Sequence, residues 1–254
     1  MPRNLPHFHL RNLGKGQGFK AKGRGSSKRP SNVADRAAHA QALLKALDSL
    51  PDISREELSG VYLEVSGRAN EPLKKSSLDS SGLTLLRYGT SSQNGVETQN
   101  ATVFATSKGV EKLQKKIEQF RDEDNPDKTR DDGTVVPGRP KNADLVQSVG
   151  AITEAGLRAL WRSPPNQFPQ DGVAVNWEVW LDPEQTERFV QGAPAHGVTV
   201  GASRLQFPED VVVIANGTRG ALATAVRRLA GVRALAVSVV TADFFDGMDV
   251  VEQA

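Results

Sequence analysis

The chain has 254 residues, of which 38% are hydrophobic and 24% are charged, and it contains no cysteine. This length is enough for one or two domains, and the lack of cysteine excludes disulfides, thiolate metal sites and a cysteine nucleophile. No apolar run approaches the roughly 20 residues that a membrane-spanning helix needs. The basic N-terminus also lacks the apolar segment of a secretory signal. We therefore expect a cytoplasmic protein that does not enter a membrane.

The net charge of +2 hides an uneven distribution along the chain. Residues 1–31 contain eight lysines and arginines, whereas every acidic residue lies further along the chain. Residues 14–25 are rich in glycine and lysine and offer too little apolar surface to offset the entropy lost on ordering. We expect a flexible, disordered basic tail over residues 1–31. A solvated linker is the favoured interpretation. A nucleic-acid-binding tail is the alternative, with candidate residues Lys15, Lys20, Lys22, Arg24, Lys28 and Arg29.

Residues 32–142 are predicted to form a first α+β unit. The expected elements are a helix over Ser31–Leu50, a strand over Gly60–Ser66, a short helix over Pro72–Asp79, strands over Leu83–Tyr88 and Ala101–Ala105 separated by a polar loop 89–100, and a helix capped by Ser107. This order is βαββα. The closing strand is not evident, and either Val135-Val136 or the segment Phe8–Leu10 would supply it. Residues 121–141 are rich in charge, glycine and proline, which indicates an exposed loop.

Residues 143–165 are predicted to connect this unit to a second one through a helix over Ala143–Trp161, and Ser163-Pro164-Pro165 would end that helix. Residues 166–242 then form a complete βαββαβ pattern. Its expected elements are a strand over Val175–Leu181, a helix beginning at Asp182-Pro183 and ending at Gly192, strands over Val198–Phe207 and Val211–Ala215, a helix capped by Thr218, and a last strand over Leu235–Val240. Residues 243–254 form a polar tail.

The predicted fold class is therefore α+β, with two ferredoxin-like βαββαβ units, connecting helices and a disordered basic N-terminal tail. Ferredoxin-like units have many functions, so the fold alone does not name one. In the strand over Val175–Leu181, Trp177 and Trp180 point to opposite faces. At most one of the two tryptophans is therefore available as a stacking platform for nucleic acid, and the other belongs to the core.

Neither a catalytic site nor a metal or cofactor site is predicted. The segments around Ser91 and His196 loosely imitate the serine and histidine motifs of subtilisin, but they occur in the reverse order and lack an orienting carboxylate. His7 and His9 share one face of an extended segment, but no further metal ligand is nearby in the sequence. Gly14-x-Gly16-x-Gly18 does not follow a strand, which excludes a Rossmann motif.

The sequence nevertheless resembles the N-terminal region of large bacterial subtilisin-like serine peptidases, the subtilases. The matching segments are Leu5–Leu10, Arg36–Leu44, Gly60–Glu64, Ala101–Phe104, Lys115–Glu118, Pro140–Val146 through Ala159–Trp161, Trp177–Leu181 and Phe207-Pro208. They follow in the family's order over nearly the whole chain. In such proteins the protease domain with its catalytic Asp, His and Ser follows this region, so none of the family's catalytic residues is carried over to this chain.

The resemblance implies a prodomain or regulatory domain. Subtilase propeptides have a ferredoxin-like fold and act as folding chaperones and inhibitors of the protease, and the family is often paired with an ATPase of the AAA class, which hints at bacterial defence. The outer face of the second sheet and the tail 243–254 would contact the protease domain. The predicted protease-binding residues are Val251, Glu252, Gln253 and Ala254. Val251 and Ala254 fit subtilase preferences if Ala254 is a processed terminus, and a chain end unrelated to processing is the alternative.

The competing hypothesis is a nucleic-acid-binding or protein-interaction adaptor that uses the basic tail and a ferredoxin-like sheet. Salt-dependent oligonucleotide binding that depends on residues 1–31 would favour this second hypothesis. Both hypotheses give the chain itself no enzymatic activity.

Overall fold

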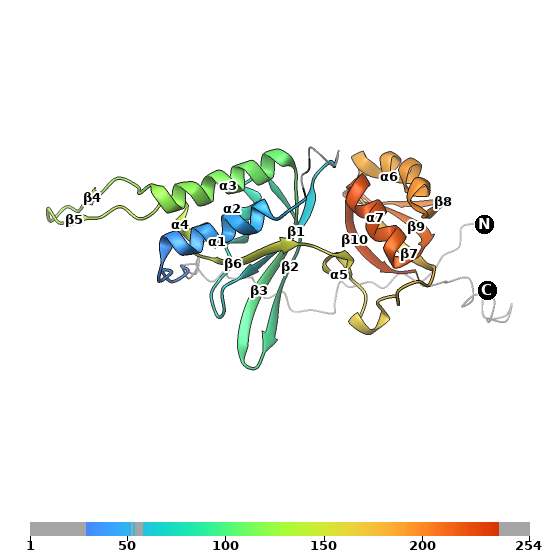
Figure 1. Cartoon of the computed structure of the whole chain (residues 1–254), viewed down its shortest axis with the longest axis horizontal. Coiled ribbons are helices and arrows are strands. Elements are labelled where there is room, and N and C mark those ends of the chain that lie inside the picture. Colours follow the sequence, from blue (N-terminus) through green and yellow to red (C-terminus); the bar gives the residue numbers. More distant parts are fainter. Residues whose placement is uncertain (1–28, 52, 54–57, 239–254) are drawn as a thin grey trace, which may run out of the picture.

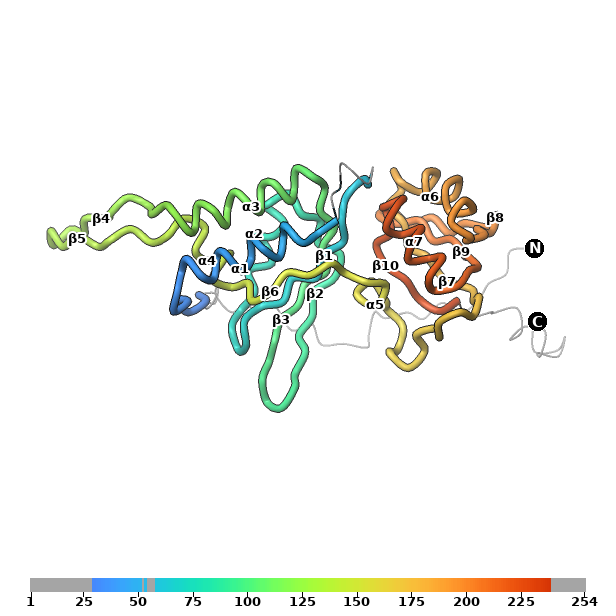
Figure 2. The backbone as a smooth tube through the Cα atoms, viewed as in Figure 1, coloured from blue at the N-terminus to red at the C-terminus, as the bar shows by residue number. Residues whose placement is uncertain are grey.

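The computed structural model describes residues 29–51, 53 and 58–238, and it places them in two α+β units that lie side by side (Figure 1). Each unit contains one four-stranded antiparallel sheet. Each sheet has its own cluster of buried apolar side chains. The backbone trace shows the two sheets joined by a short segment around α5, residues Leu157–Leu160 (Figure 2).

The first sheet has the strand order β2-β3-β1-β6. Its strands are β1 (Val61–Gly67), β2 (Leu83–Gln93), β3 (Val96–Ala105) and β6 (Val149–Glu154). Every neighbouring pair is antiparallel. Along most of the central strand β1, side chains alternately face the helices and the second unit. Leu63 and Val65 therefore lie in the core of the first unit, whereas Tyr62 lies in the core of the second.

Helices cover one face of this first sheet. They are α1 (Arg36–Asp48), α2 (Lys75–Asp79), α3 (Ser107–Asp122) and α4 (Ala143–Val146), and α1 packs against α3 (Figure 1). α3 begins where the Thr106 side chain accepts a hydrogen bond from the backbone N–H of Gly109, which satisfies one of the donors left free at a helix start. Leu113, Ile117 and Phe120 of α3 are fully buried at helical spacing.

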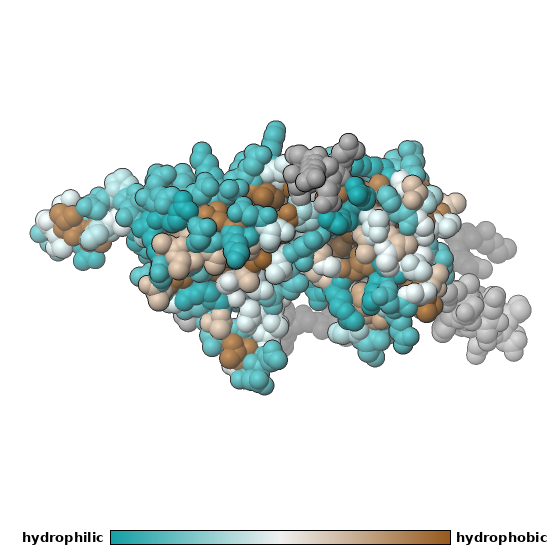
Figure 3. Space-filling view, viewed as in Figure 1, coloured by the Kyte–Doolittle hydropathy of each residue, from teal (hydrophilic) through white to brown (hydrophobic). Residues whose placement is uncertain are grey.

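Two hairpins project from the first unit (Figure 1). The β2–β3 hairpin turns at Asn94-Gly95, both of which have positive φ angles (52° and 78°), as the turn of a two-residue hairpin requires. The second hairpin pairs β4 (Lys128–Thr129) with β5 (Val135–Val136). We call residues 124–140 the arm. Val135 near its tip is 57% exposed, and Figure 3 shows an apolar spot at this far end of the molecule.

The second sheet has the strand order β10-β7-β9-β8. Its strands are β7 (Val175–Leu181), β8 (Thr199–Gln206), β9 (Val211–Gly217) and β10 (Val232–Val237). The helices α6 (Thr186–Gly192) and α7 (Arg219–Leu229) lie on one face (Figure 1). Short 3-10 helices occur at Pro165–Gln167, Pro183–Gln185 and Ala193–His196. The predicted caps Asp182 and Thr218 accept backbone N–H groups as expected.

The long helix predicted over Ala143–Trp161 is wrong. This segment forms α4, then β6, then α5. β6 pairs with β1 along its free edge, and the backbone of Gly150 approaches Gly67 so closely that an added Cβ would lie 2.8 Å from the Gly67 carbonyl oxygen. The edge of β1 would otherwise present unpaired backbone groups, so tertiary pairing overrides the helical spacing of the apolar residues. β6 is also the closing strand, in place of Val135-Val136, which pairs with β4, and of Phe8–Leu10, which lies outside the described residues.

Four further expectations need correction. The loop predicted over residues 89–100 is instead the far half of the β2–β3 hairpin. The cap of α3 is Thr106 and not Ser107. The predicted loop 121–141 contains the end of α3 and the two short strands of the arm. The first helix begins at Arg36, capped by Asp35, five residues later than predicted.

The two units meet along a seam on the face of the first sheet that the helices leave free. Phe104 and Leu86 of this face pack against the core of the second unit, and the Tyr62 ring lies 5.0 Å from that of Phe104. The α5 segment covers the same face, because the carbonyl of Ala159 accepts the Thr102 hydroxyl and that of Trp161 accepts the Arg87 guanidinium. The outer face of the first sheet is therefore largely used within the molecule.

Candidate binding surface

The outer face of the second sheet, opposite α6 and α7, carries a group of aromatic and aliphatic side chains. We call this group the outer patch, and it consists of Trp180, Leu205, Phe207 and Ile214 with Arg162 beside them. Alternation along β7 produces it: Trp177, Val179 and Leu181 are fully buried on the helix side, so Trp180 points to the other side. The prediction that the two tryptophans of β7 take opposite faces is confirmed.

The strand register brings the patch together. Trp180 lies opposite Val212 of β9, and Leu205 of β8 lies opposite the same Val212 from the other side. Phe207 follows β8 directly, and its backbone N–H donates to the Asp210 carbonyl at 2.8 Å, which closes the turn between β8 and β9. Its ring stacks on Trp180 with centroids 5.6 Å apart and an angle of 11° between the ring planes.

The stacked pair is held in place by polar contacts. The indole N–H of Trp180 donates to Glu178 Oε1 at 2.7 Å, and the Arg162 guanidinium lies 5.1 Å from a ring centroid of Trp180, a cation–π geometry. Leu205 is 64% exposed and Phe207 is 48% exposed. An aromatic pair that is fixed in orientation and open to solvent on a sheet face is typical of an interaction surface.

The two edge strands of this sheet differ in whether their outer backbone groups have hydrogen-bond partners. The edge strand β10 is covered, because the Arg162 N–H donates to the Leu235 carbonyl at 2.7 Å and the Val237 N–H donates to Ser163 Oγ at 3.0 Å. At the other edge, seven of the eight residues of β8 are exposed. Among the described residues, β8 pairs with no strand other than β9. An extended segment can therefore add to the sheet at β8.

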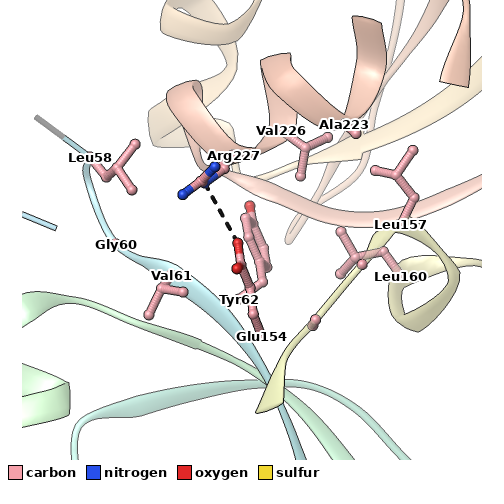
Figure 4. A pocket seen from close by; sticks show the side chains of 12 residues that line it. Leu58, Gly60, Val61, Tyr62, Glu154, Leu157, Leu160, Ala223, Val226 and Arg227 are labelled. Carbon is pink, nitrogen blue, oxygen red and sulfur yellow. Dashed lines mark ion pairs between the residues drawn. The ribbon is translucent and has the colours of Figure 1, made fainter. Parts of the chain in front are cut away.

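A hollow, which we call the seam hollow, lies at the seam between the units (Figure 4). Its volume is about 310 Å³, and most of its wall is apolar: Leu58, Val61, Leu157, Leu160, Ala223 and Val226. Tyr62 lies at its centre, and Arg227 of α7 pairs with Glu154 of β6 across it at 3.6 Å. Figure 3 shows apolar atoms along this seam.

The seam is also where the one strongly perturbed tyrosine of the described chain lies. Burial raises the pKa of the Tyr62 hydroxyl well above its ordinary value, and the Asp182 carboxylate raises it further, while the hydrogen bond with Val232 acts in the opposite direction. The Tyr62 hydroxyl therefore stays protonated at neutral pH, and it serves as a structural contact to the backbone N–H of Val232. The seam hollow is therefore best understood as part of the junction between the units.

The structure does not bring together the residues that imitate a catalytic site. Ser91 lies in the projecting β2–β3 hairpin, where its hydroxyl accepts the Asn100 amide at 3.0 Å, whereas His196 ends a 3-10 helix of the second unit. No hydrogen bond joins the two within the described residues. The described part of the chain also holds no group of three or more His, Cys, Asp or Glu residues suited to a metal ion.

Most of the predicted binding residues lie outside the described residues. This is true of Val251, Glu252, Gln253 and Ala254 and of Lys15, Lys20, Lys22, Arg24 and Lys28. His7 and His9, at which no metal site is predicted, also lie outside the described residues. Arg29 is described, and it lines a groove beside the arm. Sequence reasoning placed Trp177 and Trp180 on opposite faces without deciding which of the two faces outward. It missed Phe207 and Arg162, because a turn and a connecting segment supply them. No described helix has the length and apolar character to cross a bilayer.

No protein-family model matches the chain, and no curated protein matches it significantly. The resemblance to subtilases therefore stays a prediction based on the sequence segments themselves.

Proposed function

We propose that both sheets belong to ferredoxin-like βαββαβ units. The strand order supports this: in each unit the fourth strand lies beside the first, followed by the third and the second. The two units also share a detail at the same place, since Thr106 and Thr218 each follow the third strand and cap the second helix. An internal repeat with one inserted arm accounts for both similarities.

We propose that the chain is the non-catalytic N-terminal region of a subtilisin-like serine protease and acts as a propeptide-like chaperone, inhibitor or regulator of the protease domain. The observation that carries this proposal is the outer patch around the stacked pair Trp180 and Phe207. Within the described residues, the matching face of the first sheet is largely covered by the second unit and the α5 segment, whereas the outer patch lies on a sheet face that is open to a partner.

The predicted mode of binding has two parts. The outer patch would rest on an apolar surface of the protease domain, with the Trp180 and Phe207 rings as the buried anchors, since large aromatic side chains carry much of the energy of such interfaces. The tail residues Val251–Ala254 would bind as an extended strand in the substrate cleft. The tail follows β10 in the sequence, and β10 is a strand of the same sheet that carries the patch.

The wider setting rests on the resemblance alone. If the partner is a subtilase, an AAA-class ATPase would be a further partner. The complex would act in the cytoplasm, and the process would be bacterial defence. The chain itself would have no enzymatic activity, and the catalytic Asp, His and Ser would come from the protease domain.

Inhibition in trans is the direct test. The full chain is added to the separately produced protease domain of a large bacterial subtilase. Peptide hydrolysis is then followed as the concentration of the chain rises. We compare the chain with the double variant Trp180→Ala and Phe207→Ala and with a variant that lacks residues 243–254. The matched control is Val135→Ala, which removes an exposed apolar side chain at the tip of the arm.

We expect the full chain to inhibit the protease. The double variant of Trp180 and Phe207 should inhibit at least tenfold more weakly, because two anchors of the interface are lost. Binding in which the protease does not cleave the chain should require residues 243–254. The control should inhibit as the parent does. Absence of any binding would reject the protease partner and leave the adaptor hypothesis, which uses the basic tail, as the better account.

A further inference from the structure

The seam hollow has a buried apolar floor and an exposed polar rim. Its floor consists of the buried side chains of Leu58, Val61, Leu157, Leu160 and Val226. Arg227 and Glu154 lie at the rim, where both are exposed, and Figure 4 shows them beside the ring of Tyr62. An apolar interior with a few converging polar groups is the usual form of a small-molecule site in a protein.

Both units and the segment between them build the hollow. Val61 lies in β1 of the first unit, Leu160 in α5, and Val226 in α7 of the second unit. Ligand pockets occur preferentially at such interfaces between structural units. A ligand in the hollow would contact both units at once, and it would therefore stabilise the folded arrangement of the seam.

The size of the hollow limits the ligand to a small molecule. In liquid water, each molecule and therefore each non-hydrogen atom takes up roughly 30 Å³. A hollow of about 310 Å³ has room for about ten such atoms. The apolar floor favours an aliphatic chain, because the transfer of methylene groups out of water promotes binding. A whole nucleotide or a long-chain lipid would extend beyond this volume.

The rim supplies a cation for the polar end of such a ligand. Arg227 Nε lies 3.6 Å from Glu154 Oε1, which is longer than a hydrogen bond between nitrogen and oxygen. A guanidinium has five N–H donors and can hold a carboxylate by two parallel hydrogen bonds, so Arg227 can bind a ligand carboxylate beside Glu154. Arg188 adds positive charge nearby, since its guanidinium donates to the hydroxyl of Ser59, next to the lining residue Leu58.

We infer that the seam hollow binds an aliphatic monocarboxylate of medium chain length. The chain packs against the apolar floor and the ring of Tyr62, and the carboxylate binds Arg227 at the rim. Octanoate has the size estimated above and serves as the probe. Because the ligand contacts both units, its concentration sets how firmly the seam is held. This site is separate from the outer patch and does not depend on the proposed contact with a protease.

The test measures the binding of octanoate to the full chain by isothermal titration calorimetry and by the shift of the thermal unfolding midpoint. Octan-1-ol and octylamine are the comparison ligands, because they carry the same chain with a neutral or a cationic head group. The filling variant is Ala223→Leu, at an exposed position of the rim. Its matched control is Thr224→Leu, the next exposed position of α7, which is not among the residues that line the hollow.

A second pair of variants tests the head group. Arg227→Gln removes the cation at the rim, and Arg228→Gln is its matched control, since Arg228 is also exposed on α7 but is not among the lining residues. Unfolding midpoints measured without ligand show whether each variant is folded. The pair separates recognition of the carboxylate from a general effect of positive charge on this helix.

We expect octanoate to bind the parent with a dissociation constant on the order of 1 mM or lower and to raise the unfolding midpoint. Ala223→Leu should abolish saturable binding, because the added side chain occupies the hollow. Arg227→Gln should weaken binding by about tenfold, as expected for loss of a charge-assisted hydrogen bond. Both control variants should bind octanoate as the parent does.

Three results would overturn the inference. The first is the absence of octanoate binding to the parent chain. The second is binding of octan-1-ol or octylamine as tight as that of octanoate, because the rim would then not select a carboxylate. The third is an affinity for octanoate that Ala223→Leu and Arg227→Gln leave unchanged, because the ligand would then bind elsewhere on the chain.

Discussion

The phenolic oxygen of Tyr62, in the central strand of the first sheet, accepts a hydrogen bond from the backbone N–H of Val232 at the start of β10, at 3.0 Å. This contact joins positions 170 residues apart and links the sheets of the two units. Tyr62 is only 5% exposed. The seam between the units is therefore anchored by a buried, hydrogen-bonded ring as well as by the ion pair between Arg227 and Glu154.

Replacement of Tyr62 by Phe should loosen this seam. The ring would still fill its site, but the Val232 N–H would lose its acceptor in a buried place, which costs about 1–3 kcal/mol of unfolding free energy. Urea unfolding measures the change. Tyr88→Phe is the matched control, because the Tyr88 hydroxyl bonds the Gln99 side chain at a half-buried site within one unit. Equal losses in the two variants would contradict the special role of Tyr62.

Alkaline pH should destabilise the chain through the same hydroxyl. The folded state raises the pKa of Tyr62 above its ordinary value of 10.0, so the unfolded chain releases the proton first as the pH rises. Stability from this group is fully present below pH 10 and is lost as the pH rises above about 10. Unfolding midpoints measured from neutral to alkaline pH should fall more steeply for the parent than for Tyr62→Phe. Parallel curves would show that Tyr62 is not the responsible group.

The sequence pattern predicted the order of elements in the second unit, because most of its signals are local, although the last strand covers Val232–Val237 and not Leu235–Val240. The strand over Val175–Leu181 alternates apolar and polar residues, and the structure has β7 at those same bounds. Asp182 and Thr218 cap the segments that follow the strands. These features depend on neighbours within a few residues, which a sequence displays directly.

The errors occurred where distant partners decide the structure. Leu145, Val149 and Ile152 have helical spacing, yet β6 forms because β1 offers an open edge for pairing. Likewise the outer patch needs Phe207 from a turn and Arg162 from a connecting segment, and only the folded chain brings both to Trp180. Neither the pairing of β6 with β1 nor the assembly of the outer patch produces a periodic pattern of apolar residues in the sequence.

The starts of α3 and α7 provide a test of the repeat. Thr106 and Thr218 each accept a backbone N–H from the third residue of their helix. Thr106→Ala and Thr218→Ala should each lower the free energy of unfolding by about 1 kcal/mol. Ser107→Ala should leave it nearly unchanged, because Ser107 is the first residue of α3 and not its cap. Thermal or urea unfolding distinguishes the three variants, and a larger loss from Ser107→Ala would restore the sequence-based choice of cap.

Glycines in the first turns of the same two helices should respond in opposite ways to alanine. Gly109 of α3 lies so close to the backbone of the α2–β2 connection that an added Cβ would lie 2.6 Å from the Gly82 carbonyl oxygen. Gly220 of α7 is exposed, and an added Cβ would meet no heavy atom within 4 Å beyond its chain neighbours and the nearby backbone of its own helix.

Gly220→Ala should therefore stabilise the chain by about 0.4–1 kcal/mol, because alanine restricts the unfolded chain and has the better helix propensity. Gly109→Ala should destabilise it, by about 1–3 kcal/mol as for other overpacked sites, since α3 must move away from the sheet edge. Unfolding curves of the two variants, measured beside the parent, give the sign of each change. A stabilising Gly109→Ala would mean that α3 does not rest against Gly82 as the structure places it.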